Sequence, residues 1–589
     1  MVLQPFCFLG QVSRMEFLMD NPVEINSVER SVLEELMLLS DFQLESLMEY
    51  REKSGNILSA TELALLPGFD RAVVDELLPY ITFQVKDRFS RGGRWRGELA
   101  MKSSGAYVRD TSLLGSPYSM QLRFKSEYGE HLSGGFLLES DTGEYLFKSG
   151  YPFVDFTSFH VALKDYRAVK CLVAGDYSVR FAQGLVAWNS FSLSGIQNPS
   201  SMVRRGVGIS PYTSADEDNF YRGAAVSLSF GRLGVVAFGS YKKVDARIKD
   251  GKYTSLPEGG LHNTASSLVA RKTMGECVAG GNVSYVLDGL KLELSGLCYG
   301  YDKMNGLPVK EYNKYRLYDG WWGNFSVGVY GVFRRGQAYG EFAVDMGGST
   351  ALLAGSVFRC ADRFELGVQA RRYSRSYIAP YANGYSTISD VANQTGITLS
   401  LKYPVTRLLN FTFMADAVHY PWKRYNVDTA SSQIKGGVAG RYTPGKWDFS
   451  TDITYRYTTH NAMHRAYLKG EAGYSFSPGF HLKVKGAVVS CFQGASEPDC
   501  GWMAALVAKY CFNGEKSTLQ LGLTCYNCRS WDVRLYNYEQ DLPYTYNSRL
   551  LYGVGGGWYF LLKQKLFRNM YLYFKSDPSK MKLAVKYRF

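Results

Sequence analysis

The sequence predicts a small all-α module followed by a large antiparallel transmembrane β-barrel of about 22–26 strands. Near residue 87 the hydrophobic pattern changes from a helical period to a period of two. Aromatic residues make up 15% of the 589 residues, yet the mean hydropathy is only −0.19. No run of about 18 apolar residues occurs, which excludes transmembrane helices. A barrel remains compatible, because its strands alternate apolar and polar residues.

The first 19 residues contain a short apolar run, but no Lys or Arg precedes it. A complete secretory signal begins with such a basic stretch. We therefore expect residues 1–19 to be a signal remnant or a disordered leader, and the given start to lie within a longer precursor or to follow trimming.

Residues 20–86 show apolar residues at helical spacing, which predicts four short helices. Capping boxes begin two of them, Ser40-x-x-Gln43 and Ser59-x-x-Glu62, and Asp70 is the expected cap of the last. We expect a compact all-helical periplasmic module.

The segments "INSVERSVLEEL", "MEYREKSGNILSATEL" and "LPGFDRAVVDEL" resemble the tandem helix-hairpin-helix module of competence-type DNA receptors. In that family, backbone amides of a Gly-hydrophobic-Gly turn bind a phosphate. The resemblance implies phosphate or partner contacts at five residues, Gly68, Phe69, Arg51, Lys53 and Arg71.

This sequence departs from the family pattern, because Asp70 replaces the second glycine of the "GFD" turn and repels a phosphate. Residues 1–86 hold 6 Lys/Arg and 14 Asp/Glu, which gives this part a net charge of about −8. Since the whole chain has a net charge of +13, residues 87–589 carry about +21. An acidic module lacks the basic face that DNA binding requires. We therefore expect it to dock a periplasmic protein partner, with DNA binding disfavoured.

From residue 87 the period of two continues to the C-terminus. In "KWDFSTDITYRYT", Trp447, Ile453 and Tyr455 share one face with other apolar residues, while Asp448 and Arg456 lie on the other. A soluble sandwich shows this alternation in a few strands only. Its extent over residues 87–589, with aromatics at strand ends, predicts an outer-membrane barrel.

Short turns such as "YPVT", "TPGK", "SPGF" and "FNGE" recur about every 36 residues, which sets the expected strand number. Longer excursions are expected at about 183–218, 250–277, 303–320, 374–393 and 529–548. A barrel of this size encloses a lumen too wide to leave open. We expect the 183–218 excursion to plug it.

The C-terminal "MKLAVKYRF" alternates and ends in an aromatic residue. It resembles the β-signal that the barrel-assembly machinery of Gram-negative bacteria reads, which implies that role for Leu583, Val585, Tyr587 and Phe589. With the helical module, the segments at 174–188, 204–225, 420–428 and 536–544 resemble the family of helix-hairpin-helix domain-containing outer-membrane barrel proteins.

Chemistry-bearing residues are scattered. We expect no catalytic, cofactor or metal residues, because the seven histidines (131, 160, 262, 419, 460, 464 and 481) show no metal spacing and no "GxSxG" motif occurs. Cys491 and Cys500 flank one predicted loop and are candidates for a disulfide. Asp216 to Asp218, before Arg222, are expected to form ion pairs, with a calcium site as the alternative.

The resulting hypothesis is a non-enzymatic outer-membrane barrel for transport, translocation or assembly of a macromolecule or bulky solute. The alternatives are DNA uptake through the helical module and a lipid-modifying barrel enzyme. Expected partners are outer-membrane lipid, lipopolysaccharide and the barrel-assembly machinery, since the positive excess suits an anionic surface or solute.

Overall fold

The computed structural model describes most of the barrel and part of the N-terminal region. It covers residues 95–589 apart from 109, 130, 190–194, 205, 334, 361–363, 407, 478, 495 and 513–515. Before residue 95 it covers only 23–26, 39, 43, 47–48, 50–51, 57, 59–64, 66, 69, 74, 77–78 and 80–83.

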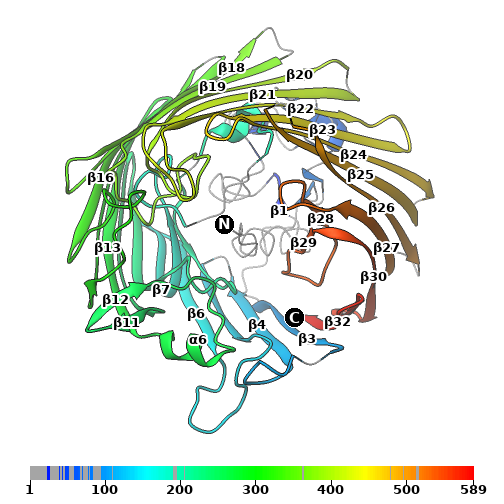
Figure 1. The fold of residues 1–589 in the computed structure, drawn as a ribbon, viewed down its shortest axis with the longest axis horizontal. Helices are drawn as coiled ribbons and strands as arrows, with labels where there is room; N and C mark the ends of the chain where they lie inside the picture. The colour runs from blue at the N-terminus through cyan, green and yellow to red at the C-terminus, as the bar shows by residue number, and fades with distance from the viewer. Residues whose placement is uncertain are drawn as a thin grey trace.

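The described residues form one closed antiparallel β-barrel (Figure 1). Twenty-five strands belong to this sheet, and β8 pairs only with β7, which leaves twenty-four in the ring. The prediction of about 22–26 strands is confirmed. The first half of the ring comprises β3 (Trp95–Ala106), β4 (Tyr118–Tyr128), β5 (Leu132–Ser140), β6 (Phe156–Tyr166), β7 (Val169–Arg180), β9 (Tyr221–Phe230), β10 (Leu233–Val244), β13 (Met274–Leu287), β14 (Leu290–Tyr301), β16 (Trp322–Phe333), β17 (Gly336–Asp345) and β18 (Thr350–Cys360). The second half comprises β19 (Phe364–Tyr373), β20 (Gln394–Pro404), β21 (Leu409–Tyr420), β22 (Ser431–Tyr442), β23 (Trp447–Thr458), β24 (Met463–Ser477), β25 (Phe480–Gln493), β26 (Asp499–Phe512), β27 (Ser517–Cys528), β30 (Gly553–Phe567), β31 (Met570–Ser576) and β32 (Lys580–Arg588).

The first and last strands close the ring. β3 pairs with β32 from Glu98↔Arg588 to Ala106↔Lys580. Beyond this ladder, Gly97 and Phe589 exchange two backbone hydrogen bonds, with N···O distances of 3.0 and 3.1 Å. Closure removes the unpaired strand edges that lipid cannot satisfy.

The wall has an apolar outer face and a polar inner face, as the period of two predicts. The cross-strand pair Leu294 and Val327 is 58% and 55% exposed and faces outward. Their neighbours Glu293 and Ser326 point inward and are buried. At the turn end, aromatic rings such as Trp447 and Tyr474 pack together, with centroids 4.6 Å apart. Such a band with an aromatic girdle matches a lipid bilayer.

The two ends of the barrel differ in loop length. At the end where β3 begins and β32 ends, all connections are short turns, including those predicted at "YPVT" and "TPGK". At the opposite end lie the long connections, and all five predicted excursions fall there. Transmembrane barrels place short turns in the periplasm and long loops outside the cell.

Small elements occur within the long connections. They are η2 (Pro199–Met202), β8 (Gly208–Pro211), β11 (Arg247–Lys249), β12 (Lys252–Ser255), α6 (Ala265–Ala270), β15 (Met304–Asn305), β28 (Leu535–Tyr538) and β29 (Ser548–Leu551). Figure 1 shows the β28–β29 hairpin inside the ring. In the described part of the chain, no helix has the length and apolar character needed to cross a membrane.

The N-terminal region differs from its prediction. Its elements with described bounds are one four-residue helix, α4 (Ala60–Leu63), and a parallel pair, β1 (Val23–Glu24) and β2 (Ile81–Thr82), and described residues at 43, 47–48, 50–51, 74 and 77 are helical as well. Ser59 caps α4 as predicted, accepting a hydrogen bond from the Glu62 amide. The resemblance to the helix-hairpin-helix family is nevertheless wrong, because the described residues show no all-helical module. Caps and apolar spacing are local signals, and they do not determine tertiary assembly.

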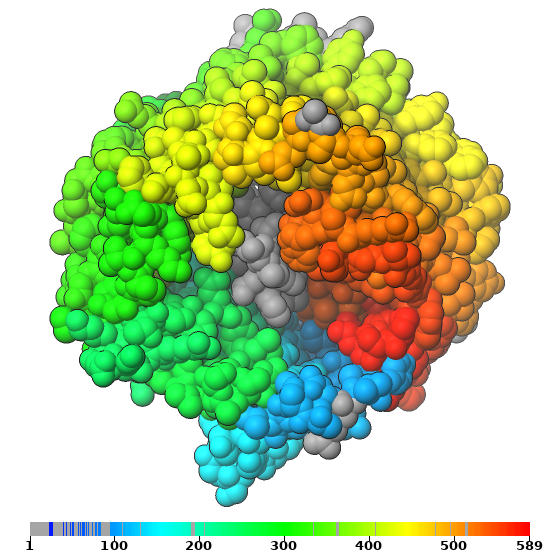
Figure 2. Space-filling view, viewed as in Figure 1, coloured from blue at the N-terminus to red at the C-terminus, as the bar shows by residue number. Residues whose placement is uncertain are grey.

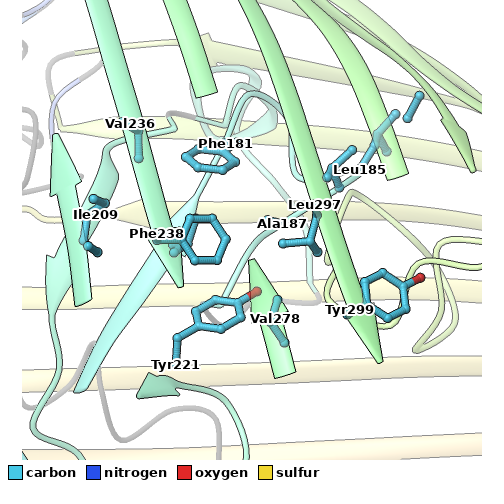
Figure 3. Packing of buried hydrophobic residues seen from close by; sticks show 14 of the residues in the cluster. Phe181, Leu185, Ala187, Ile209, Tyr221, Val236, Phe238, Val278, Leu297 and Tyr299 are labelled. Atoms are coloured by element: carbon cyan, nitrogen blue, oxygen red, sulfur yellow. The ribbon is translucent and has the colours of Figure 1, made fainter. Parts of the chain in front are cut away.

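The largest apolar core lies inside the barrel (Figure 3). Inward side chains of the wall, including Phe238, Val278 and Tyr299, pack against Phe181 and Leu185 from the connection after β7. A core in this position means that the lumen along these strands is filled.

Candidate functional site

The candidate functional site is the inner face of the barrel together with three segments that fold onto it. These are the 181–220 segment, the 374–393 segment and the 529–552 segment, named by their residues. Each connects two wall strands at the long-loop end.

The 181–220 segment begins where β7 leaves the wall. Residues 181–188 are all buried. Farther along, the Gln197 carbonyl accepts a hydrogen bond from Ser400 of β20 (2.5 Å), and the Asn198 side chain accepts one from Thr412 of β21 (2.8 Å). The segment thus extends from β7 to strands far along the ring, within the region predicted as a plug.

Glu341 of β17 anchors this segment. Its Oε2 accepts hydrogen bonds from the backbone amides of Gln183 (2.9 Å) and Leu185 (3.0 Å). The side chain is 1% exposed. One buried carboxyl oxygen thus satisfies two backbone amides of the segment, so this contact is a principal polar attachment of the segment.

The 374–393 segment packs against the first. The Trp188 amide donates to the Tyr381 carbonyl (2.8 Å), and the Asn383 amide donates to Gly184 (3.0 Å). On the wall strands β19 and β21, Arg371 and Asp416 form a bidentate ion pair (2.8 and 3.1 Å), and both side chains are at most 1% exposed.

The 529–552 segment covers the region of the β3–β32 seam. Asp541 forms ion pairs with Lys582 and, at 3.4 Å, with Lys575. The Tyr544 hydroxyl accepts a hydrogen bond from Lys586 (2.9 Å), which also pairs with Glu98 (2.8 Å). This segment therefore neutralises the basic inner face of β31 and β32.

The inner face of β22–β26 differs, because most of its inward side chains remain partly exposed along β22–β24 and along the turn-end halves of β25 and β26, whereas Val489, Cys491 and Met503 nearer the long-loop end are buried. It carries eight basic residues: Lys435, Arg441, Arg456, Arg465, Lys469, Lys483, Lys485 and Lys509. Only four acidic residues share its strands and orientation: Asp448, Asp452, Glu471 and, at the long-loop end of β26, Asp499. Figure 2 shows a hollow at the centre of the long-loop face, bordered by yellow and orange parts of the chain.

Three of these cations form a row across neighbouring strands. Lys435 pairs in register with Arg456, and Arg456 with Arg465. Within the described residues, no carboxylate lies within ion-pair distance of any of the three. Like charges directly opposite each other destabilise a sheet, and a bound anion offsets that cost. We call these three residues the cation row.

A second charged cluster lies among the long connections. His262 is 2% exposed, and its two ring nitrogens lie 2.6 Å from carboxylate oxygens of Asp155 and Asp245. Burial alone disfavours the charged ring, but these hydrogen bonds outweigh it and raise the pKa of His262 to about 9. Burial, followed by the nearby Asp155 charge, raises the pKa of Glu144 to about 7.

The predicted N-terminal contact residues are only partly visible. Gly68, Lys53 and Arg71, like Asp70 and residues 1–19, lie outside the described residues. Phe69 is buried in an apolar cluster with Leu66 and Val74, so its side chain faces that cluster. Arg51 is half-buried beside the Met48 sulfur (3.6 Å).

The predicted β-signal residues lie on the outer face of β32. Leu583, Tyr587 and Phe589 are 43–46% exposed, and the Phe589 ring stacks on Phe124 with centroids 6.1 Å apart. Their orientation agrees with the alternation in the sequence. Their recognition by assembly machinery stays a prediction.

Two local predictions do not match the structure. Cys491 and Cys500 are free, because Cys491 points inward while Cys500, opposite Ser490, points outward. Arg222 pairs with Asp176 (2.7 Å) and not with the acidic stretch before it. The Asp216 carboxylate instead accepts hydrogen bonds from backbone amides of its own turn, and the Asp218 carboxylate accepts one from the Gly259 amide (2.8 Å).

Comparisons with known proteins support no closer assignment. The chain matches none of the protein-family models and none of the curated proteins. Among solved structures it is similar to the FrpB iron transporter from Neisseria meningitidis (10% identity, TM-score 0.38, 85% of this chain and 83% of that one). Others are the siderophore receptor PirA from Acinetobacter baumannii (7%, 0.42, 86% and 82%) and a BenF-like porin from Pseudomonas fluorescens Pf-5 (8%, 0.30, 84% and 98%).

These similar proteins are described as transporters, receptors and porins, and not as helix-hairpin-helix proteins. The assignment of this chain rests on its own features: a closed sheet, an apolar outer band, an aromatic girdle, and long loops at one end only. The protein is an integral β-barrel of the outer membrane, and the long-loop end faces the outside of the cell.

Proposed function

We propose that the protein transports a bulky anionic solute across the outer membrane without a catalytic step. The observation that carries this proposal is the cation row, Lys435, Arg456 and Arg465, on the partly exposed inner face. A cleft lined by one sign of charge concentrates the opposite ion and raises its rate of entry.

The arrangement of the three segments supports the same function. The 181–220 and 374–393 segments fill the lumen along β7 to β21, and the first of them reaches β22, where Lys435 donates to the Gly195 carbonyl (3.3 Å). The 529–552 segment covers the wall near the seam and accepts a hydrogen bond from Arg465 at the Arg534 carbonyl (3.2 Å). The partly exposed portion of the arc from β22 to β26 therefore offers the charged route, and displacement of a segment widens it. DNA uptake depended on the helix-hairpin-helix resemblance and is not supported once that resemblance is withdrawn.

Ion selectivity in planar bilayers tests the proposal. The purified protein should give channels whose reversal potential in a KCl gradient shows a preference for chloride. Lys435→Gln and Arg456→Gln should each reduce this preference, since each removes one positive charge from the row. Lys243→Gln makes the same charge change on the outer face of β10 and should leave selectivity unchanged.

Two results would refute the proposal. One is a wild-type channel that prefers cations, or a preference for chloride that Arg456→Gln does not alter. The other is the absence of conductance both in the wild type and in Glu341→Ala, in which the 181–220 segment has lost its anchor.

A further inference from the structure

We propose that Glu144, Asp155 and His262 bind one divalent transition-metal ion, with Zn²⁺ as the first candidate, at the extracellular end of the barrel. The three side chains are buried, and one potential ligand atom from each lies within 4.8 Å of the other two. They come from two separate connections, the one between β5 and β6 and the one between β10 and β13. These three residues are not part of the proposed solute route.

The donor atoms match this class of ion. One imidazole nitrogen and two carboxylate oxygens suit Zn²⁺ and its neighbours in the first transition row. Calcium and magnesium prefer ligand sets made entirely of oxygen.

Asp245 orients the histidine for this role. Its Oδ2 lies 2.6 Å from His262 Nε2 and accepts the hydrogen on that nitrogen. Nδ1 faces Asp155, also at 2.6 Å. A carboxylate behind a metal-binding histidine is the usual support, because it fixes the tautomer and makes the free nitrogen more basic.

Binding of the metal ion releases one proton from His262. The hydrogen between His262 Nδ1 and Asp155 Oδ2 (2.6 Å) occupies the place of the ion, so metal binding displaces this proton, which leaves to solvent or buffer. Asp155 remains held through its other oxygen, because Arg271 Nε lies 2.9 Å from Oδ1. The cation also offsets the cost of burying the Glu144 charge.

The residues around the site leave a path for the ion from solvent and connect the site to two extracellular loops. A pocket of about 450 Å³ is open to solvent and is lined by Asp155, Arg271 and Lys272 among others. The Glu144 carboxylate is positioned by the amides of His262 (2.8 Å) and Asp141 (2.7 Å). A bound ion therefore clamps two extracellular connections together.

Titration of the full-length protein in detergent with Zn²⁺ tests the proposal by calorimetry and by metal analysis after dialysis. We expect about one equivalent bound, with proton release and a higher melting temperature. His262→Asn and Glu144→Gln should abolish this binding. Asp245→Asn should weaken it by about tenfold to a hundredfold while all three ligands remain.

His131→Asn is the matched control, because His131 is exposed in the short turn before β5 and should not affect the site. Titration with Co²⁺ should give visible absorption bands without thiolate charge transfer, which separates this site from the cysteines. Absence of binding in a wild-type protein that is folded by circular dichroism overturns the proposal, and so does binding that persists in Glu144→Gln or that is as tight in Asp245→Asn as in the wild type. His262 is then only a charged clasp between two aspartates.

Discussion

Removal of the Glu341 carboxylate should release the 181–220 segment from the barrel wall. Glu341→Ala leaves the amides of Gln183 and Leu185 without their acceptor in a buried site. Each unsatisfied buried amide costs about 1–3 kcal/mol, so the docked state loses about 2–6 kcal/mol. The substitution also removes the cost of burying the carboxylate itself, so we expect about 2–4 kcal/mol, the lower half of that range.

Hydrogen exchange measured by mass spectrometry reports this loss directly. Amides of residues 181–189 should exchange roughly thirtyfold to a thousandfold faster in Glu341→Ala than in the wild type, as 2–4 kcal/mol requires. In bilayers the same variant should open more often or to a larger conductance. Glu341→Gln keeps an oxygen acceptor and should show a smaller effect.

Glu365→Ala is the matched control. This residue also lies in the wall, on β19, but its ion pair with Arg359 (3.1 Å) is partly exposed. Such pairs contribute about 0–1 kcal/mol. Our account of the anchor is refuted if exchange of residues 181–189 in Glu341→Ala stays within about twofold of the wild type, or if Glu365→Ala has an equal effect.

Two further predictions concern stability and assembly. Arg371→Met should destabilise the barrel by about 3–5 kcal/mol in urea unfolding, because Asp416 is left buried and unpaired. The double variant Arg371→Met/Asp416→Leu should recover most of this loss. A double variant that is less stable than Arg371→Met contradicts the prediction. Deletion of Phe589 should lower the folded, heat-modifiable fraction in cell membranes, since it removes the terminal aromatic residue and both hydrogen bonds to Gly97; an unchanged folded fraction would show that this residue is not part of a β-signal.

The wall of the barrel was predictable because its signals are local. Strand β23 covers Trp447–Thr458, which matches the alternation in "KWDFSTDITYRYT", and the opposite faces of Ile453 and Asp452 follow from a period of two. Short turns and long excursions were visible for the same reason. They are set by Gly, Pro and Asn between apolar runs.

The excursion at 183–218 was predicted to enter the lumen, but the contacts that hold the lumen segments were not predictable, since they join residues far apart in the sequence. Glu341 lies 158 and 156 residues from the two amides that it binds. His262 lies 107 residues from Asp155 and 118 from Glu144. Alternation shows that Glu341 points inward, but it does not show which segment returns to meet it. The sequence signal for this anchor was a charged residue at an inward-facing strand position, which indicates a buried polar contact but not its partner.

The lumen of this barrel therefore separates two properties that a simple pore combines. Access depends on how firmly the segments dock, and Glu341 lies among strands covered by the 181–220 segment. Selectivity depends on the cation row, in which Lys435 donates to the Gly195 carbonyl of the 181–220 segment (3.3 Å) and Arg456 lies one strand farther along the ring. Residues that share no contacts usually act independently. Glu341→Ala should hence raise conductance without altering ion preference, and Arg456→Gln should alter preference without raising conductance. A variant of either residue that changed both properties equally would place the segment and the cation row in one coupled unit.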